Sequence, residues 1–521
     1  MQRIAWASRL SVVLLLMIPY FLLAQDNKPG TPALSLRDCL VQALANNLSL
    51  SVEAFNPDMQ AEVAVAAKEE FLPQFGASFI RQNSTSLGVW GLQGTSYPYT
   101  FTDYGFTLTE KIPTGTTAVL DIGNTSSTTG QKYSVINPAY YGLIQLTLTQ
   151  SLIRGFGPKV NRSAIYQAER QKEIATAALK TKVIQTIYDT EQAYWNLYSA
   201  LESLKVQESS LVQSREVLKR AKEGERIGNQ SALDVLNAEA SVADWEDGLV
   251  SARLRVLESE SDLRRILNLA PADPGAAVPT LSDKPAMEKI SLSYDEALGK
   301  AIVHRPEIVQ AEKRIAIYSS EASYQANQAL PQLDLSLRGW SQGQSGVRYL
   351  YQNDDPLTGI VVGSIVGSRW DAFSQALKGS YKSWSASLTL TVPMADIISR
   401  ARLTQARLQE KQGLADLEVQ KQAVAFEIDD ALKQIRNAEL RMESSAANRA
   451  LQEKRLAAVF QSYQLGLRDS QWLFEYQRQS AIARMNEIQA LIDYRMAAAR
   501  LERAMGTTLE TNGLNFRDYT F

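Results

Sequence analysis

Cysteine and histidine are almost absent from this chain of 521 residues, which contains one of each, Cys39 and His304. A single cysteine excludes an internal disulfide framework, and we interpret Cys39 as a small packed residue. Without a cysteine pair or a histidine cluster, no metal site is expected, and His304 is interpreted as a polar residue at a helix end. Gly155-Phe156-Gly157 lacks the third glycine of a nucleotide-binding loop. We therefore expect neither an enzyme nor a bound cofactor.

An excess of charge of one sign is also missing, since 54 basic residues face 56 acidic ones and the net charge is −2. Nothing in this balance favours nucleic acid as a partner. Beyond the N-terminus, no stretch approaches the roughly 18 to 20 uninterrupted apolar residues that a membrane helix needs. If the rest of the chain spans a bilayer, we expect a closed β-barrel, because only helices and closed barrels satisfy every backbone group in lipid.

The N-terminus has the features of an export signal. Arg3 and Arg9 precede an apolar run that continues to Leu23 and ends at the small residue Ala24. We predict a secretory signal peptide over residues 1–24, with cleavage before the next residue. The mature protein is therefore expected outside the cytoplasm.

The mature sequence contains an internal duplication. Leu72-Pro73-Gln74 recurs as Leu330-Pro331-Gln332, and several earlier positions recur at the same separation of 258 residues. Gly228 matches Gly466 at a separation of 238 residues, which neighbouring pairs share. Such self-similarity predicts two structural repeats. The chain then divides into a first repeat at 25–270, a linker at 271–290, a second repeat at 291–506 and a tail at 507–521.

Each repeat is predicted to contain the same succession of elements: a helix, a strand, a long variable segment, a strand, a very long helix, a turn and a returning helix. The first helices are expected at 35–70 and 293–329, where Leu-Pro-Gln ends them because proline disfavours helix in the residue before it. Four principal strands, in which apolar and polar residues alternate, are expected near residues 75–79, 144–149, 333–338 and 384–392.

The alternation fits membrane strands of about 9 to 11 residues, and it fits a half-buried sheet of a soluble protein equally well. The variable segments 83–141 and 341–382 are not assigned. Within the first of them, alternation around Phe106 and Leu120 and a turn at Pro113-Thr114-Gly115 indicate an extra hairpin. Such a hairpin would either extend a barrel on the outside or cap it.

Glycine and proline are absent from residues 161–223, and these 63 residues predict a helix of about 95 Å. Leucines recur every seventh residue in its second half, as in helices that pack as coiled coils. Gly228 and Gly466 are predicted to end the long helix of each repeat in a tight turn. Shorter helices are expected to return at about 231–267 and 470–505, so that each repeat forms a helical hairpin.

Four principal strands are too few to close a barrel. An open edge in lipid would leave unpaired backbone groups, each at a cost of several kcal/mol. Three chains with four strands each would give twelve, the smallest symmetric arrangement that leaves a wide interior. We therefore predict a mixed α and β membrane protein, a trimeric twelve-stranded β-barrel continued by a long α-helical coiled-coil tunnel.

The chain resembles the TolC-type outer-membrane efflux proteins over nearly its whole mature length, from Leu34 to Gly506. The duplicated first helix, the Leu-Pro-Gln start of a strand, the Thr-Gln-Ser-Leu sequence near Gln150 and the two glycine-centred hairpins carry the resemblance. The resemblance implies a homotrimer in outer-membrane lipid, with its tunnel in the periplasm. It also implies a passive exit duct for efflux or type I secretion, to which a periplasmic adaptor protein and an inner-membrane pump dock.

In the family that the chain resembles, contacts near the helical turns close the periplasmic end. Tyr463 and Arg468 match the family pattern Tyr-x-x-Gly-x-Arg, and Asp234 stands where an acidic partner is expected. These residues are gate candidates by resemblance. Trp472 and Glu475 replace two aspartates of an acidic ring, which weakens cation binding and favours a hydrophobic constriction. Alternatively, Arg468 only neutralises helix-end carbonyls and Asp234 only stabilises the first turn of its helix.

An exported structural coiled coil, such as an envelope spacer or adhesin, is the main alternative. It explains the signal peptide and the heptads but leaves the four amphipathic strands unexplained, and dependence on detergent would distinguish the two. Among channels, the sequence does not separate drug, metal-ion and protein cargo, because the pump and the adaptor select it.

Overall fold

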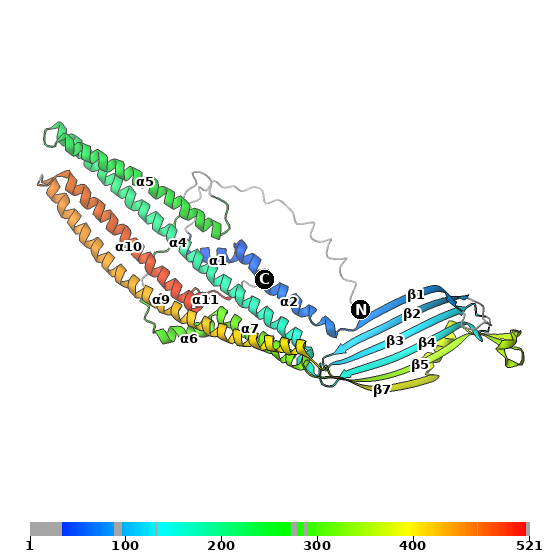
Figure 1. Ribbon diagram of the computed structural model, residues 1–521. Coiled ribbons are helices and arrows are strands. Elements are labelled where there is room, and N and C mark those ends of the chain that lie inside the picture. Colours follow the sequence, from blue (N-terminus) through cyan, green and yellow to red (C-terminus); the bar gives the residue numbers. More distant parts are fainter. Residues whose placement is uncertain are drawn as a thin grey trace, which may run out of the picture.

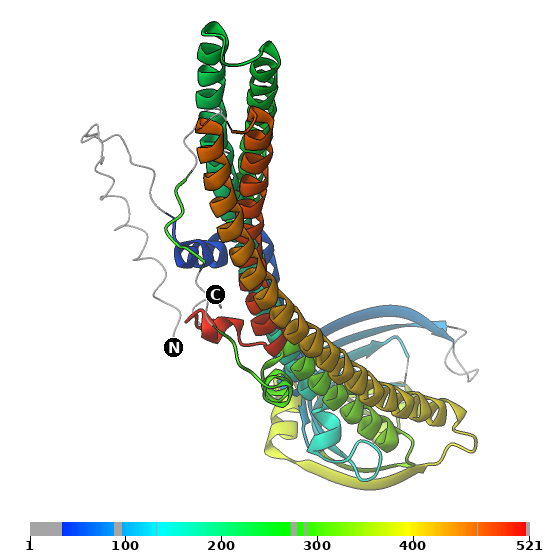
Figure 2. The same cartoon turned by 90° about the vertical axis from the view of Figure 1, so that its left-hand side faces the viewer.

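The molecule is elongated, with an antiparallel sheet at one end and long helices that extend from it to the other end (Figure 1). A second view shows the curved sheet behind those ends of the long helices that lie nearest to it (Figure 2). None of the helices in the described part of the chain is long and apolar enough to cross a membrane. The predicted signal peptide, 1–24, lies outside the described residues. The computed structural model describes residues 34–87, 96–131, 133–271, 279–285, 289–465 and 467–516.

Two helical hairpins form the long part of the molecule. α4 (Ser163–Arg226) has 64 residues and α9 (Ile397–Gln464) has 68. Each chain segment then turns back into a shorter helix, α5 (Ala232–Ile266) or α10 (Ser470–Met505). The prediction of very long helices with shorter returning partners is confirmed.

Large side chains fill the seams along which these helices pack. Ile187, Tyr194 and Leu197 of α4 are completely buried, and so is Ile428 of α9. A separation of seven residues places Ile187 and Tyr194 on one face of their helix. Cys39 joins the same core as Tyr194, and burial raises the pKa of its thiol to about 11. Cys39 is therefore a packed residue, as expected.

Shorter helices lie beside the long ones. The single helices expected at 35–70 and 293–329 are wrong, because each is divided in two. The divided helices are α1 (Leu36–Asn46) with α2 (Leu48–Ala66), and α6 (Tyr294–His304) with α7 (Pro306–Gln328). Short helical turns also occur elsewhere, as η1 (Glu69–Phe71), α3 (Pro158–Asn161), η3 (Gln352–Asp354) and η4 (Pro356–Thr358).

Capping chemistry explains both breaks. Asn47 has an extended backbone, and its side chain accepts a hydrogen bond from the backbone N–H of Leu50, which starts a new helix. Arg305 is extended in the same way and precedes Pro306, whose missing N–H suits the first position of a helix. His304 is the last residue of α6, as expected for a polar residue at a helix end.

The sheet is antiparallel and has the order β1-β2-β3-β4-β5, with β6 and β7 both paired to β5. β1, β4, β5 and β7 are the four expected strands. β2 and β3 form the extra hairpin, which lies in the sheet between β1 and β4. The bounds are β1 (Gln74–Leu87), β2 (Ser96–Ile112), β3 (Thr116–Thr129), β4 (Ile136–Ser151), β5 (Gln332–Tyr351), β6 (Val361–Val366) and β7 (Tyr381–Thr391).

The prediction of four strands per chain is therefore wrong. The predicted barrel of twelve strands depended on that number and is no longer supported by it. Alternation identifies the two faces of a strand but not the strand beside it. The hairpin was expected outside a barrel or over its end. It pairs instead with β1 along one edge and with β4 along the other.

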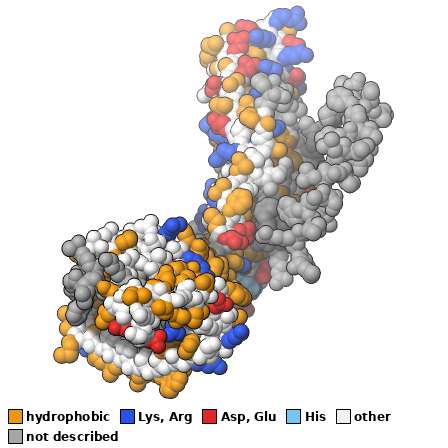
Figure 3. All heavy atoms as spheres, turned by 90° about the vertical axis from the view of Figure 1, so that its right-hand side faces the viewer, with side chains coloured by type: hydrophobic (Ala, Val, Ile, Leu, Met, Phe, Trp, Pro, Cys, Tyr) orange, Lys and Arg blue, Asp and Glu red, His pale blue; other side chains and the backbone are white. Residues whose placement is uncertain are grey.

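One face of the sheet is strongly apolar. Phe106, Ile122 and Ile144 are neighbours on this face across β2, β3 and β4. Phe75 and Trp384, near the two edges, have 71% and 80% of their surface exposed. Figure 3, viewed from the sheet end, shows hydrophobic side chains gathered over the sheet, whereas charged side chains crowd the far end of the helices. An exposed apolar surface of this extent marks an interaction with lipid or protein.

A short helix covers part of the apolar face. α8 (Arg369–Lys378) lies on β4 and β5, and its Ala372 and Ala376 are buried. Gly142 and Gly343 are paired beneath it and bring no side chain that would hold the helix away. The segment 341–382, which the sequence left unassigned, thus supplies the end of β5, all of β6 and α8.

α11 (Thr508–Thr511) and Asn512, which follows it, are attached to the middle of α4. The Nδ2 of Asn512 donates to the carboxylate of Glu191 at 3.1 Å. Burial of Glu191 raises the pKa of its carboxyl group, while the hydrogen bond from Asn512 and the charge of Arg495 oppose this shift. The ionised form of Glu191 therefore costs stability.

We expect Glu191→Gln to raise the free energy of unfolding at pH 7 by about 1 kcal/mol, the usual size of a single-residue effect. Glutamine keeps the acceptor for Asn512 and removes the charge. Because the folded pKa is raised, the cost of the charge is absent below about pH 4 and appears as the pH rises through the raised value. Thermal unfolding at pH 4 and pH 7 measures this difference. The exposed Glu208→Gln on the same helix is the control, and an equal gain in both variants would contradict the explanation.

Candidate functional site

The two hairpin turns lie together at the end of the molecule farthest from the sheet (Figure 1). The turn between α4 and α5 contains Gly228 with a φ of 80°, the left-handed conformation that ends a helix. Gly466, predicted for the other turn, lies outside the described residues. We call this end of the molecule, residues 227–234 and 463–475, the tip.

Asp234 stabilises the start of α5. Ser231 caps the helix by accepting from the backbone N–H of Asp234 at 3.2 Å, and Asp234 accepts from the backbone N–H of Ser231 at 3.0 Å. The side-chain hydrogen bond from Ser231 is the largest cause that lowers the pKa of Asp234, and Ser470 contributes further. The carboxylate is therefore charged at neutral pH. This part of the alternative interpretation, a residue that stabilises its own first turn, is what the structure shows.

Asp234 has a second role, because it also contacts the other hairpin. The hydroxyl of Ser470, at the start of α10, donates to Asp234 at 3.1 Å. Tyr463 forms a similar link, since its hydroxyl accepts from the side-chain amide of Gln230 at 3.0 Å. Two hydrogen bonds thus join the two hairpins of one chain at the tip. We call them the tip bonds.

In the described part of the chain, the ring contact of Arg468 with Trp472 and the ion pair of Glu475 lie within the second hairpin. The guanidinium of Arg468 lies over the ring of Trp472 at 5.2 Å, in cation–π geometry. Glu475 is paired with Arg478 at 2.9 Å. Tyr463 and Asp234 therefore each contact the opposite hairpin, through Gln230 and Ser470, whereas the contact of Arg468 lies within its own hairpin.

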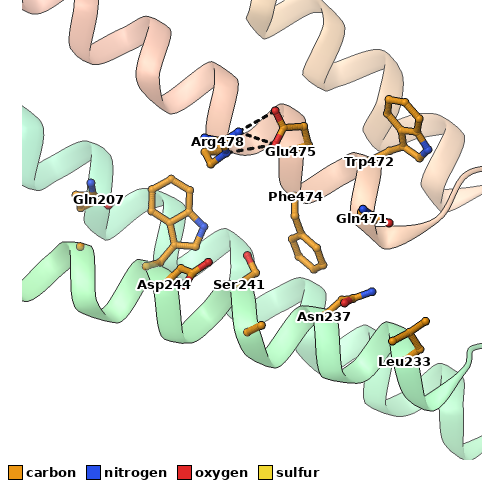
Figure 4. Close-up of a pocket in the computed structure, with 13 residues that line it drawn as sticks. Gln207, Leu233, Asn237, Ser241, Asp244, Gln471, Trp472, Phe474, Glu475 and Arg478 are labelled. Carbon is orange, nitrogen blue, oxygen red and sulfur yellow. Dashed lines mark hydrogen bonds and ion pairs between the residues drawn. The ribbon is translucent and has the colours of Figure 1, made fainter.

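A cleft of about 860 Å³ opens between α5 and α10 next to the tip. Figure 4 shows Phe474 of α10 pointing toward α5, where Ser241 and Asn237 lie, while Glu475 is turned toward Arg478. Trp472 lies at the edge of this cleft with 48% of its surface exposed. Among the described residues, no group of three His, Cys, Asp or Glu side chains is placed to hold a metal ion.

Sequence reasoning missed the partners in the tip bonds, Gln230 and Ser470. Ser470 is the first residue of α10, whereas Ser231 precedes α5 and caps it, so a comparison of the two helix starts gave no signal for Ser470. Gln230, the partner of Tyr463, carried no signal either. A single amide two residues beyond the turn glycine has no pattern that distinguishes it from other exposed amides.

The fold and the tip define a class of protein. An amphipathic sheet with two open edges, joined end to end with long helical hairpins that meet at a hydrogen-bonded tip, is the architecture of an outer-membrane channel subunit. The chain belongs to the outer membrane efflux protein family, whose sequence pattern matches residues 117–269 and 297–507. The resemblance to TolC-type proteins is thereby confirmed.

Solved structures share the fold. The outer-membrane channel OprN gives a TM-score of 0.64 at 17% sequence identity, over 91% of this chain and 90% of that one. CmeC from Campylobacter jejuni gives 0.62 at 14% identity, over 91% of this chain and 86% of its own. The open state of MtrE from Neisseria gonorrhoeae gives 0.62 at 16% identity, over 91% and 89%. No curated protein matches the chain.

Family membership places the protein in the outer membrane, with its helices extending into the periplasm. The protein is an outer-membrane efflux channel, and the role of its family is passive transport. The exported structural coiled coil that was weighed as an alternative is not supported.

Proposed function

We propose that three copies of this chain assemble into a passive exit duct, to which a periplasmic adaptor protein and an inner-membrane pump dock at the tip. The observation that carries this proposal is the pair of open sheet edges. In the described part of the chain, β1 pairs only with β2 and β7 only with β5. Unpaired edge groups in lipid cost several kcal/mol each, so pairing β1 of one copy with β7 of the next stabilises the wall. The polar face then lines a lumen for small molecules or polypeptides.

In this proposal the tip is the periplasmic gate. Tyr463 and Asp234 hold the two hairpins together, and each tip bond contributes only about 0.5 to 1.5 kcal/mol. Contacts of this strength hold the tip closed and still yield to a docking adaptor. Trp472, fixed by Arg468, supplies a hydrophobic surface that narrows the opening, while Glu475 is neutralised by a neighbouring arginine.

The two hairpins are proposed to belong to two structural repeats, at 25–270 and 291–506, joined by the linker 271–290. The helices before the strands support this division, because α1 and α6 both have 11 residues and both end at an extended residue that starts the next helix. Two hairpins per chain would place twelve long and short helices around the tunnel of a trimer.

The protein purified in detergent should behave as a trimer and insert into planar bilayers with discrete conductance steps. Its stability should depend on the amphiphile, because in the described part of the chain α8 covers only a portion of the apolar face and the edges of β1 and β7 are unpaired. Mass measurement of the detergent complex and single-channel recording check both expectations. A monomer that stays folded in water without amphiphile would overturn the proposal.

A further inference from the structure

The hairpin of β2 and β3 is a full-length part of the sheet. β1 and β2 are paired over fourteen residues of each strand, from Gln74 opposite Thr109 to Leu87 opposite Ser96. β2 and β3 are paired over fourteen residues as well, and β3 continues into an equally regular pairing with β4. A hairpin outside the wall would leave β1 next to β4, and no such pairing occurs among the described strands.

The hairpin also continues both faces of the sheet without a break. On the apolar face, Leu108, Leu120 and Leu146 are neighbours across three strands. On the polar face, Asp121 of β3 accepts from the hydroxyl of Thr107 at 3.1 Å and from Gln145 at 3.4 Å. A membrane wall needs this sidedness on every strand, because side chains alternate between lipid and lumen.

The turn of the hairpin is built into the junction between sheet and helices. The backbone N–H of Gly157 donates to Thr114 at 3.0 Å, and that of Ser151 donates to Gly115 at 3.3 Å. At Gly115, with a φ of 93°, a Cβ atom would lie 2.3 Å from the carbonyl oxygen of Gly155, so only glycine fits. These contacts hold the turn of the hairpin at the junction where the sheet meets the helices.

At the same junction, an ion pair joins the hairpin to η1, the segment that leads into β1. Lys111, near the end of β2, is paired with Glu70 of η1, directly before β1. The hairpin is thereby attached at its turn as well as along both strands. An extracellular cap would have neither attachment.

We propose that the assembled duct has an eighteen-stranded wall, with six long strands from each of three copies. This inference rests on the trimer of the proposed function. β6 is left out of the count because its six residues pair only with the far end of β5. Eighteen is an even number within the range of known bacterial barrels. The open edges β1 and β7 of successive copies would form the three seams.

The larger strand number widens the exit. With strands about 4.8 Å apart and tilted by about 40°, eighteen strands give a backbone diameter of roughly 36 Å, whereas twelve give roughly 24 Å. The number of tunnel helices is unchanged by the hairpin. The wall in the membrane is therefore wider than the twelve-stranded wall that the family resemblance implies. The tip, and not the wall, would then limit the size of the molecules that pass.

Electron cryomicroscopy of the full-length protein in detergent tests the strand count directly. We expect a threefold particle whose membrane wall shows eighteen strands in cross-section. A threefold particle with twelve strands in the wall, and residues 96–129 outside it, would overturn this inference and leave the proposed function intact. A particle without a threefold closed wall would overturn both.

A deletion variant gives a second readout. Removing residues 96–129 takes out β2 and β3 and leaves β1 and β4 as antiparallel neighbours joined by the remaining loop residues. Polyethylene glycols added on the sheet side of a planar bilayer should enter the intact channel up to a diameter about 1.5-fold larger than in the variant. Equal cut-offs in two threefold channels would contradict the wider wall. If the variant does not assemble, the strand count of the intact protein decides.

Discussion

Removing both tip bonds is expected to shift the channel strongly toward an open state. Tyr463→Phe removes the hydroxyl that accepts from Gln230, and Ser470→Ala removes the hydroxyl that donates to Asp234. At about 1 kcal/mol for each bond, the double variant loses roughly 2 kcal/mol per chain and roughly 6 kcal/mol in a trimer that opens as a unit. The ratio of open to closed channels should then rise by up to about four orders of magnitude.

Single-channel recording in planar bilayers measures this ratio as the open probability. The matched control carries Tyr476→Phe and Ser462→Ala, which remove a tyrosine and a serine hydroxyl within the second hairpin. Tyr476 accepts only from Arg455 of α9, and Ser462 donates to a carbonyl of its own helix. The control should record like the parent protein. If the two double variants have the same open probability, the tip bonds do not close the channel.

Local rules were enough to predict the long helices and four of the strands. Residues 161–223 lack glycine and proline and repeat leucine every seventh residue, which favours a long helix packed on another helix, and α4 contains all but the first two of these residues. Alternation located β7 in the same way, since Trp384 and the apolar residues that follow it share one face. Gly228 was also predictable, because a glycine after a long helix commonly takes a left-handed conformation.

Features that depend on contacts between distant residues were not predictable from one sequence. Alternation in the segment 83–141 indicated the hairpin of β2 and β3, but nothing in it specified β1 and β4 as neighbours. The link between Gln230 and Tyr463 joins residues 233 positions apart. α8 was missed although Trp370, Phe373 and Leu377 recur at helical spacing, because ten residues are too few for this periodicity to identify a helix.

A substitution at the glycines on which α8 packs, Gly142 and Gly343, is expected to have the second large effect, a loss of stability. A Cβ atom on Gly343 would lie 1.9 Å from the backbone oxygen of Ala372, and one on Gly142 would lie 2.7 Å from the same oxygen. Because this atom belongs to the helix backbone, it has no rotamer by which to move away. Gly343→Ala should therefore lift α8 from the sheet or bend β5, at a cost of about 1 to 3 kcal/mol in each copy.

Gly339→Ala provides a control on the same strand and the same face. No atom lies within 4 Å of a Cβ built on Gly339, so this variant has only the general effect of replacing glycine by alanine in a strand. That effect is a gain of about 0.5 to 1 kcal/mol and applies to both variants. The difference between their thermal unfolding midpoints therefore isolates the contact with α8. We expect Gly343→Ala to unfold at a lower temperature than Gly339→Ala and to be cut faster by protease between residues 352 and 380. Equal midpoints and equal cleavage would mean that α8 does not rest on the paired glycines.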